Sequence, residues 1–318
     1  MKCLLQFVFL FLILSFGAHA KPISFEPFSG KLSPERFVPQ YSPDDYFIQG
    51  QRYLENQSYR QALLCFGMIT HHFPQDPLYS KALYFSGVCY FKKGQPDLAD
   101  KAFSAYLQRP DAEYSEELFS MKYSIAQSFA QGKRKRLFLL EGFPKLTNAD
   151  QDALRIYDEV LTAFPTQDLG AKSLYLKGDL LIIKNELSEA IKTMKKLTLQ
   201  FPDHELSPKA FLRLSEIYLA QAKKEPDNLQ YLNFAKQNKI AMERQHPNHP
   251  LNTEVSANVQ AMCEHYASGL YSTGRFYEKK KKLEAASIYY STALRNYPDT
   301  SLVAKCHKRL DRIAKHTS

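Results

Sequence analysis

The sequence contains no tryptophan, few glycines and, after its first 20 residues, no long apolar stretch. Its 318 residues include only 12 Gly but 20 Tyr and 22 Phe, and 44% are hydrophobic. This composition excludes a largely disordered chain and suits a helical protein whose core is packed with rings. The length allows two ordinary domains or one long solenoid of repeats.

Motifs for catalysis and metal binding are also missing. There is no Gly-rich phosphate loop, no Gly-x-Ser-x-Gly and no Cys or His cluster with ligand spacing. His71 and His72 are adjacent, so their rings diverge on a helix, while His246 and His249 flank a Pro-rich turn. Two carboxylate pairs suit helix N-termini better than catalysis, namely Asp44-Asp45 and Glu116-Glu117. We therefore expect no enzyme, no cofactor and no metal site.

The N-terminus carries the one long apolar run. Lys2 precedes 13 mainly apolar residues, Leu4 to Phe16, and Ala18-His19-Ala20 fits the small-x-small cleavage rule. The pattern predicts a secretory signal over 1–20, with a mature chain that begins at Lys21. The alternative is a membrane anchor, but 13 residues fall short of the roughly 20 needed to span a bilayer.

The chain is basic, with 42 Lys plus Arg against 33 Asp plus Glu. The cations are spread out, and only Lys133 to Arg136 and Lys279 to Lys282 are dense runs. We interpret both runs as solvated positive faces; the alternative is a contact with anionic lipid or an acidic protein. Nucleic acid is not an expected partner of an exported chain.

Four cysteines remain beyond the signal: Cys65, Cys89, Cys263 and Cys306. Each falls within an expected helix, where a free Cys usually behaves as a small buried apolar residue. An exported compartment permits disulfides, and Cys65 with Cys89 is the favoured pair if one forms, because their hairpins should stack as neighbours.

A repeat of fixed spacing is the most informative feature. Gly50, Tyr53, Ala62, Phe66 and Pro74 are separated by 3, 9, 4 and 8 residues. Two further segments repeat these intervals, at Gly178, Leu181, Ala190, Met194 and Pro202 and at Gly274, Tyr277, Ala286, Tyr290 and Pro298. The spacing resembles the tetratricopeptide pattern, in which two antiparallel helices cross at small residues beside rings.

Looser copies raise the number of units to six. The predicted fold is an all-α, right-handed solenoid of about six tetratricopeptide-type hairpins with a C-terminal capping helix. The repeats lie near 44–79, 80–111, 113–166, 171–203, 208–248 and 258–299, within a repeat domain spanning 44–318. The cap at 301–315 should bury Leu302, Val303, Cys306, Leu310 and Ile313 and expose Lys305, Lys308, Arg309 and Arg312.

Two segments do not fit the repeat. Residues 21–43 contain five prolines and no helical period, so we expect an extended tether, part of which lies along the first hairpins. Gly132 to Asn148 is a long insertion that begins basic and continues with Leu137-Phe138-Leu139-Leu140. A short helix or a partner contact would explain that apolar run.

The concave surface of such a stack is lined mainly by the first helix of each hairpin and suits a bound peptide. The pattern places eleven candidate partner-binding side chains there: Phe47, Gln51, Tyr84, Val88, Phe91, Tyr123, Gln127, Tyr175, Asp179, Tyr271 and Arg275. Their rings offer contact area and their amides offer hydrogen bonds. The alternative role for each is packing between hairpins.

Both ends of the repeat domain resemble one family. The stretches concerned are Ser58 to Ala62, His72 to Pro74 and Tyr79 to Ala82 near the start, and Phe276 to Glu278, Glu284 to Ala286 and Asn296 to Thr300 near the end. They are similar to BamD (ComL), the tetratricopeptide component of the outer-membrane β-barrel assembly machine. The resemblance implies a periplasmic scaffold at the outer membrane, with unfolded outer-membrane proteins at its first repeats and a BamA-like subunit at its last.

Two features depart from that family, since Lys stands at position 21 in place of an acylated Cys, and six repeats replace five. Two alternative functions remain open. One is a periplasmic coordinator of envelope synthesis or division, like the Tol-Pal accessory proteins, although the coiled coil typical of those is not visible. The other is an envelope enzyme or peptidoglycan-binding protein, which would need a carboxylate-rich cleft at the insertions 133–148 or 223–232.

Overall fold

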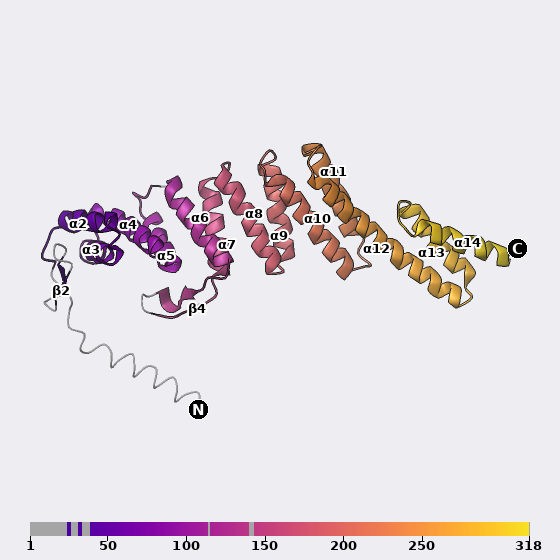
Figure 1. Cartoon of the computed structure of the whole chain (residues 1–318), viewed down its shortest axis with the longest axis horizontal. Coiled ribbons are helices and arrows are strands. Elements are labelled where there is room, and N and C mark those ends of the chain that lie inside the picture. The colour runs from indigo at the N-terminus through magenta and orange to yellow at the C-terminus, as the bar shows by residue number, and fades with distance from the viewer. Residues whose placement is uncertain (1–23, 27–30, 34–38, 114, 140–142, 318) are drawn as a thin grey trace, which may run out of the picture. The chain divides into compact units, whose positions relative to one another are not determined.

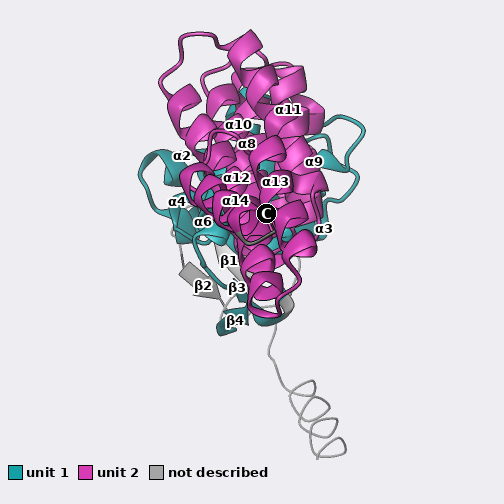
Figure 2. Cartoon of the chain, turned by 90° about the vertical axis from the view of Figure 1, so that its right-hand side faces the viewer, with its two compact units in different colours: residues 1–153 teal, residues 154–318 magenta. Residues whose placement is uncertain are grey.

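The computed structural model describes residues 24–26, 31–33, 39–113, 115–139 and 143–317. Within these residues lie thirteen α-helices and two short two-stranded sheets (Figure 1). The chain divides into two compact units, residues 1–153 and 154–318, which are coloured separately in Figure 2. The expected secretory signal over 1–20 lies outside the described residues.

Unit 1 contains two helical hairpins, a further helix and the first insertion. Helix α2 (Pro43–Glu55) pairs with α3 (Tyr59–His72), and α4 (Leu78–Lys92) pairs with α5 (Pro96–Leu107). Helix α3 also packs on α4, and α5 packs on α6 (Glu116–Ala130). The insertion forms β3 (Lys135–Arg136), the 3-10 helix η1 (Leu137–Leu139) and β4 (Lys145–Thr147). It leads into α7 (Asp150–Ala163), within which the unit ends.

The Pro-rich segment before α2 forms a small sheet in its described part. Strands β1 (Ser24–Glu26) and β2 (Lys31–Ser33) pair antiparallel, with Phe25 opposite Leu32. Strand β1 contacts α3, as expected for a segment that lies along the first hairpin. The pairing of the strands was not predicted. Ser42 then begins α2 with a capping box, in which its hydroxyl accepts from the Asp45 N–H at 3.2 Å.

Unit 2 continues the same helix-pair architecture. Helix α8 (Asp168–Ile183) pairs with α9 (Leu187–Gln200), and α10 (Ser207–Lys224) pairs with α11 (Gln230–Gln245). Helix α12 (Leu251–Lys279) pairs with α13 (Leu283–Asn296), which packs on α14 (Val303–Thr317). The predicted all-α, solenoid-type class is confirmed. Helix α12 begins at Leu251, well before residue 258, because no helix-breaking residue follows Pro250.

At four crossings the glycine of the repeat lies against a large side chain of the second helix. A Cβ atom added to Gly50 would lie 2.6 Å from Phe66 Cε1, so only glycine allows this approach. The other crossings repeat the arrangement with Gly87 against Phe103, Gly178 against Met194, and Gly274 against Tyr290. The expected packing of a small residue against a ring or other large side chain is thus confirmed.

The turn between the two helices of a repeat contains one residue in the left-handed region. Its φ is close to 60° in four repeats, at Gln57, Gly94, Asn185 and Lys281. At the last of these, Lys281 N–H donates to Glu278 O and Lys282 N–H donates to Tyr277 O, both at 3.0 Å. These bonds satisfy carbonyls at the helix C-terminus in a Schellman motif. Gln57, Asn185 and Lys281 are not glycine, and each raises the free energy of the folded state by roughly 1 kcal/mol at this φ.

Helix α14 covers the end of the last hairpin. Cys306 and Ile313 are buried in one cluster with Ala286, Tyr290 and Ala293 of α13. The predicted capping role is therefore confirmed. One side chain differs from the prediction, because Arg309, which we expected in solvent, pairs with Glu278 Oε1 of α12 at 3.2 Å.

The basic run Lys133 to Arg136 is only partly the solvated face that we expected. Arg136 is buried, and Asp97 on α5 accepts from its backbone N–H at 2.8 Å and from its guanidinium at 2.6 Å. Lys135 pairs with Asp152. These cations form β3 and fasten the insertion to α5, so only Lys133 and Arg134 remain exposed. The expected short helix is present as η1.

A second buried ion pair lies on the same helix. Asp100 on α5 accepts from the Lys122 ammonium of α6 at 2.7 Å, and the Lys122 side chain is fully buried. Ser104 also accepts from this ammonium, at 3.1 Å. A buried charge is stable only when it is paired and hydrogen-bonded, and both conditions are met here.

The four cysteines within the described residues are free thiols. Cys65 and Cys89, the pair that would be favoured if a disulfide formed, are both buried and are not bridged. Burial raises the pKa of each thiol to about 12. They therefore act as small apolar core residues, as expected, and Cys89 packs in one cluster with Ala62, Phe66 and Ala82.

Candidate functional site

Unit 1 contains a cleft that collects side chains from four helices, α2, α4, α5 and α6, and from the loop before α6. It has a volume of about 440 Å³ and is called here the first groove. Its lining residues come from these elements: Phe47, Gln51, Ser80, Lys81, Tyr84, Phe85, Tyr106, Asp111, Glu113, Ser115 and Glu117. Three of the eleven predicted partner-binding residues, Phe47, Gln51 and Tyr84, are brought together in it.

Aromatic rings form the apolar wall of the first groove. The Phe47 and Phe85 ring centroids lie 5.6 Å apart, and those of Tyr84 and Tyr106 also lie 5.6 Å apart. Phe66, buried at the crossing of the first hairpin, supports Phe47 and Phe85 from behind at 5.9 and 5.7 Å. The wall is therefore fixed by the hairpin core and keeps its shape without a ligand.

A hydrogen-bonded loop forms one rim. The Ser80 hydroxyl donates to Asp111 Oδ1 at 2.8 Å, and Arg109 Nε donates to the Ser80 oxygen at 3.3 Å. The Arg109 guanidinium also lies over the Tyr79 ring, 5.0 Å from its centroid. The Ser80 hydroxyl, then the backbone and Arg109, hold the pKa of Asp111 below its ordinary value. Asp111 therefore stays ionised at neutral pH.

The remaining rim adds two more carboxylates. The Glu113 N–H donates to the Tyr106 hydroxyl at 2.7 Å, which ties the loop to α5. Burial, and then the charge of Glu117, raise the pKa of Tyr84, so its hydroxyl remains protonated. Among the lining residues, Lys81 is the one cation beside three carboxylates. The groove thus combines an apolar wall with a rim that accepts hydrogen bonds and favours positive charge.

The other predicted residues of unit 1 do not line this groove. Val88 and Phe91 are half-buried on α4, further along the helix than Tyr84. On α6, the Gln127 amide donates to the Tyr123 hydroxyl at 3.3 Å. These four residues are therefore not placed at the same site as Phe47 and Gln51.

The predicted residues of unit 2 make contacts between neighbouring helices. Asp179 on α8 accepts from Arg213 Nε of α10 at 3.0 Å. Burial raises the pKa of Asp179 more than Arg213 lowers it. Tyr175, half-buried on the same helix, packs against the unit 2 core, and burial followed by the charge of Asp179 raises its pKa. These two side chains connect successive repeats, which is the alternative role considered for them.

Tyr271 and Arg275 are likewise occupied within unit 2. The Tyr271 ring lies 5.6 Å from the Tyr290 ring of α13. Burial raises the pKa of Tyr271, but hydrogen bonds with Arg275 and Arg309 outweigh it, and the net pKa is lowered. Tyr271 thus links α12 to the capping helix α14 through Arg309, and Arg275 supports it from the same helix.

Several residues of the first groove were missed by the repeat pattern. Ser80 lies in the first turn of α4, and Tyr106 lies on a second helix, where we expected no partner contact. Asp111 and Glu113 belong to the connection after Pro110. The clustering of acidic residues between 111 and 117 was the available signal, and we had interpreted only Glu116-Glu117, as helix N-terminal charges.

The second insertion lines an open cleft of about 530 Å³ that contains two carboxylates. Its lining residues all come from the end of α10 and the turn that follows: Lys224, Glu225, Pro226, Asp227 and Asn228. At the second insertion, Glu225 accepts from the Asn228 amide at 3.2 Å and from the Tyr231 hydroxyl at 3.4 Å, so it holds the turn between α10 and α11. Across the described ranges, no group of three or more His, Cys, Asp or Glu could hold a metal ion. None of the described helices is both long enough and apolar enough to cross a bilayer.

Comparison with known proteins identifies the repeat. A tetratricopeptide-repeat family model matches residues 49–114, and a second one matches 171–204 and 267–300. No curated protein matches the sequence.

Three solved structures are compared with this chain by identity, coverage and TM-score. YrrB, described as a TPR protein with an unusual peptide-binding site, is 15% identical with a TM-score of 0.36, over 68% of this chain and 92% of that one. MamA 41-end from Desulfovibrio magneticus RS-1 is 18% identical with a TM-score of 0.34, over 64% and 97%. A tetratricopeptide repeat protein from Parabacteroides merdae ATCC 43184 is 12% identical with a TM-score of 0.36, over 86% and 98%.

The matched repeats include the α2–α5 segment that forms most of the first groove and the two regular hairpins of unit 2. Such repeats form scaffolds that bind other proteins. The chain therefore contains tetratricopeptide repeats, and repeats of this type imply a scaffold for protein–protein interaction.

Proposed function

We propose that this protein is a periplasmic scaffold in the assembly of outer-membrane β-barrel proteins, and that it binds an unfolded client in the first groove. The observation that carries the proposal is the groove itself, where a rigid aromatic wall faces an acceptor-rich rim. The process is inferred from the BamD-like stretches at both ends of the repeat domain and from the signal-like residues 1–20.

The groove suits the chemistry of an unfolded barrel strand. Strands of outer-membrane barrels alternate apolar and polar side chains, so an extended segment presents rings or aliphatic groups on one side only. Phe47 and Phe85 would contact that apolar side. The Gln51 amide and the ionised Asp111 could accept backbone N–H groups, which are unpaired in an extended chain.

The assembly partner would bind the other end of the chain. In this proposal a BamA-like subunit docks on the last repeats, and the protein associates peripherally with the outer membrane. The Lys279 to Lys282 run is exposed at the turn between α12 and α13, so an acidic surface of the partner would complement it.

Site-specific photocross-linking in cells tests the client site. A photoreactive residue at Gln51, inside the groove, should form adducts with outer-membrane β-barrel precursors. The matched control is Arg60, exposed on α3 and absent from the groove lining, which should not form them. Equal adducts at both positions, or none with barrel proteins, would contradict the proposal. Adducts with division or peptidoglycan-synthesis proteins would instead support the coordinator function.

Export can be tested separately. Mass spectrometry of the protein purified from the periplasm should find a free N-terminus at Lys21. An intact N-terminus in the cytoplasmic fraction would remove the periplasmic location from the proposal while leaving the binding result interpretable.

A further inference from the structure

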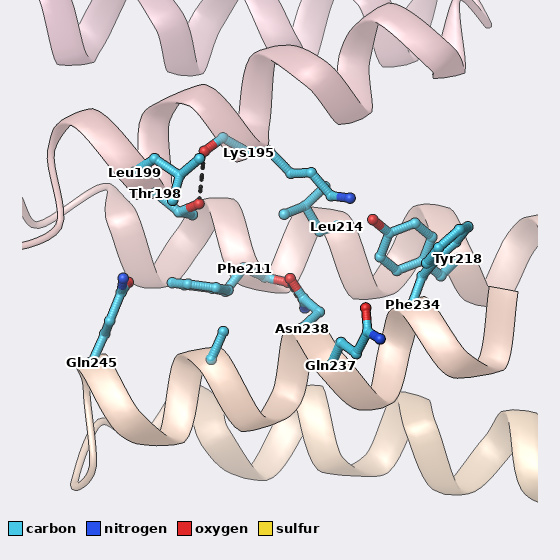
Figure 3. Close-up of a pocket in the computed structure, with 11 residues that line it drawn as sticks. Lys195, Thr198, Leu199, Phe211, Leu214, Tyr218, Phe234, Gln237, Asn238 and Gln245 are labelled. Carbon is cyan, nitrogen blue, oxygen red and sulfur yellow. Dashed lines mark hydrogen bonds between the residues drawn. The ribbon is translucent and has the colours of Figure 1, made fainter. Parts of the chain in front are cut away.

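Unit 2 contains a second cleft on a different set of helices. It lies between α9, α10 and α11, has a volume of about 210 Å³ and is called here the second groove (Figure 3). Its lining residues are Lys195, Thr198, Leu199, Phe211, Leu214, Tyr218, Phe234, Gln237, Asn238, Ala241 and Gln245. Helices α9 and α11 are second helices of their hairpins, so none of the eleven predicted partner-binding residues belongs to this cleft.

One half of the second groove is mainly apolar and open. Leu199 and Phe211 line it, and Figure 3 shows Phe211 between α9 and α11 with Thr198 and Gln245 at the same end. Ala241 packs on the cluster that contains Phe211. Leu199 is 75% exposed and Phe234, on the other side, is 40% exposed. A single exposed apolar residue is ordinary, but two that flank one cleft leave an apolar surface that a partner can cover.

The other half contains two hydrogen-bond donors, the Lys195 ammonium and the Tyr218 hydroxyl. Tyr218 is only 1% exposed, and its hydroxyl has no hydrogen-bond partner within the described part of the chain. Burial raises the pKa of Tyr218 to about 12, so the hydroxyl stays protonated and able to donate. A buried hydroxyl without a partner is costly, and an acceptor supplied by a ligand would remove that cost.

The charge of the second groove points to the acceptor. Figure 3 places Lys195 and Tyr218 in the same half, and the Lys195 ammonium lies 5.4 Å from the Phe234 ring centroid. No Asp or Glu occurs among its described lining residues. The Asn238 amide is already used, because it donates to the Phe211 carbonyl at 2.9 Å. A carboxylate would therefore meet a cation and a hydroxyl donor with no opposing negative charge.

We propose that the second groove binds a segment of a partner protein in which an apolar side chain lies next to a carboxylate. The apolar side chain would fill the half lined by Leu199, Phe211 and Ala241, and the carboxylate would reach Lys195 and Tyr218. Gln237 and Ala241 are one helical turn apart, about 6 Å. That spacing fits residues two apart in an extended segment or four apart on a helix.

This site goes beyond the client groove of unit 1 and does not depend on it. The first groove is rimmed by carboxylates, whereas the second carries a cation, so the two would select segments of opposite charge. A repeat scaffold with both could hold two partners at once.

Selection from a library of short random peptides displayed on phage tests the proposal, with the chain from Lys21 as bait. Washing the bound phage with an excess of the soluble Lys195→Glu variant would remove peptides that bind other surfaces, because the variant retains those surfaces. The phage that stay on the bait are then sequenced. We expect enriched peptides to carry Leu or an aromatic residue two or four positions from Asp or Glu. By fluorescence anisotropy, Lys195→Glu should weaken a selected peptide about tenfold or more. A peptide with Lys in place of its acidic residue should have a higher affinity for the Lys195→Glu variant than for the original chain.

Tyr218→Phe separates binding from folding. It removes only the hydroxyl, so the melting temperature should stay the same or rise, while the affinity for the selected peptide falls about tenfold. The matched control is Lys196→Glu, on the same helix but outside the lining, and Gln51→Glu controls for the first groove. Both should leave affinity unchanged.

Three results would overturn the proposal. The first is an enriched set without acidic residues, and the second is equal affinity for the original chain and Lys195→Glu. The third is concentration-dependent self-association that Lys195→Glu abolishes, since a second copy of this chain would then be the occupant.

Discussion

The two units use one helical hairpin for different surfaces. In unit 1 the charges are partly internal, with Asp97 and Asp100 buried against Arg136 and Lys122, and the groove carries carboxylates. In unit 2 the comparable pair of Asp179 with Arg213 is half-exposed, and the groove carries a cation. The repeat pattern thus determines how helices cross, while residues outside the pattern determine the sign of each binding surface.

The largest difference between the two units in lost stability should appear when one carboxylate is removed from each. Asp97→Ala leaves the Arg136 guanidinium buried and unpaired, which should lower the free energy of unfolding by about 3–5 kcal/mol. Asp179→Ala breaks a pair whose Arg213 side chain is 41% exposed, and should cost less than about 1 kcal/mol. Urea unfolding followed by circular dichroism measures both, and hydrogen exchange should locate the first loss in α5 and β3–β4.

A double substitution distinguishes charge from packing. Asp97→Leu combined with Arg136→Met removes both buried charges and should recover most of the stability lost in Asp97→Ala. If Asp97→Ala costs no more than Asp179→Ala, the contrast between internal and surface charge is wrong.

The next difference in stability concerns the glycines at which the two helices of a hairpin cross. Gly87→Ala would place a Cβ 2.5 Å from the buried Phe103 ring, and the overpacking should cost about 1–3 kcal/mol despite the better helix propensity of Ala. Gly178→Ala meets the end of Met194, whose flexible side chain can move aside, so its melting temperature should change little. Gly269→Ala, on a helix with open space at the Cβ position, is the control and should be stabilising. Equal losses at Gly87 and Gly178 would show that the second helix cannot adjust in either unit.

Substitutions in the turns between paired helices should give two smaller changes in stability, of opposite sign in the two units. Gly94 in unit 1 and Lys281 in unit 2 both have a left-handed φ, and a Cβ at Gly94 would meet nothing within 4 Å. Gly94→Lys should therefore destabilise by about 1 kcal/mol, and Lys281→Gly should stabilise by a similar amount. The control is Lys282→Gly, since Lys282 has φ −94° and gains nothing from glycine. Thermal melting measures all three, and a stabilising Lys282→Gly would contradict the backbone explanation.

The features that could be predicted from the sequence are those that recur with the repeat spacing. Gly50 opposite Phe66 follows from spacing, because a crossing needs a small and a large residue at fixed intervals. Phe47, Gln51 and Tyr84 were predicted for the same reason, since first helices face one way. The position of a repeat does not reveal whether a side chain is free, and Asp179 was therefore placed on a binding surface although it pairs with Arg213.

Contacts outside the period could not be predicted. Asp97 and Arg136 are 39 residues apart, and one of them lies in an insertion that no other repeat shares. Asp111 reaches the first groove only because its loop folds back to Ser80. The Tyr218 hydroxyl has no partner within the described residues, and that property depends on every neighbour of the ring at once.

The smallest expected effect is a pH dependence of opposite sign in the two units. The folded pKa of Asp111 is lowered by the Ser80 hydroxyl, so its stabilising contribution is present above the ordinary value of 3.8 and is lost as pH falls through the folded pKa. The folded pKa of Asp179 is raised by burial, so its contribution is present below 3.8 and is lost as pH rises through the folded pKa. Carbon-13 NMR of the Asp carboxyls should show the two midpoints on opposite sides of 3.8. Asp111→Asn should then destabilise unit 1 at neutral pH, whereas Asp179→Asn should leave unit 2 unchanged or slightly more stable, because the amide resembles the protonated acid that burial favours. Midpoints on the same side would mean that the half-buried pair in unit 2 is held as firmly by Arg213 as Asp111 is by Ser80, and the contrast between the two surfaces would then rest on the grooves alone.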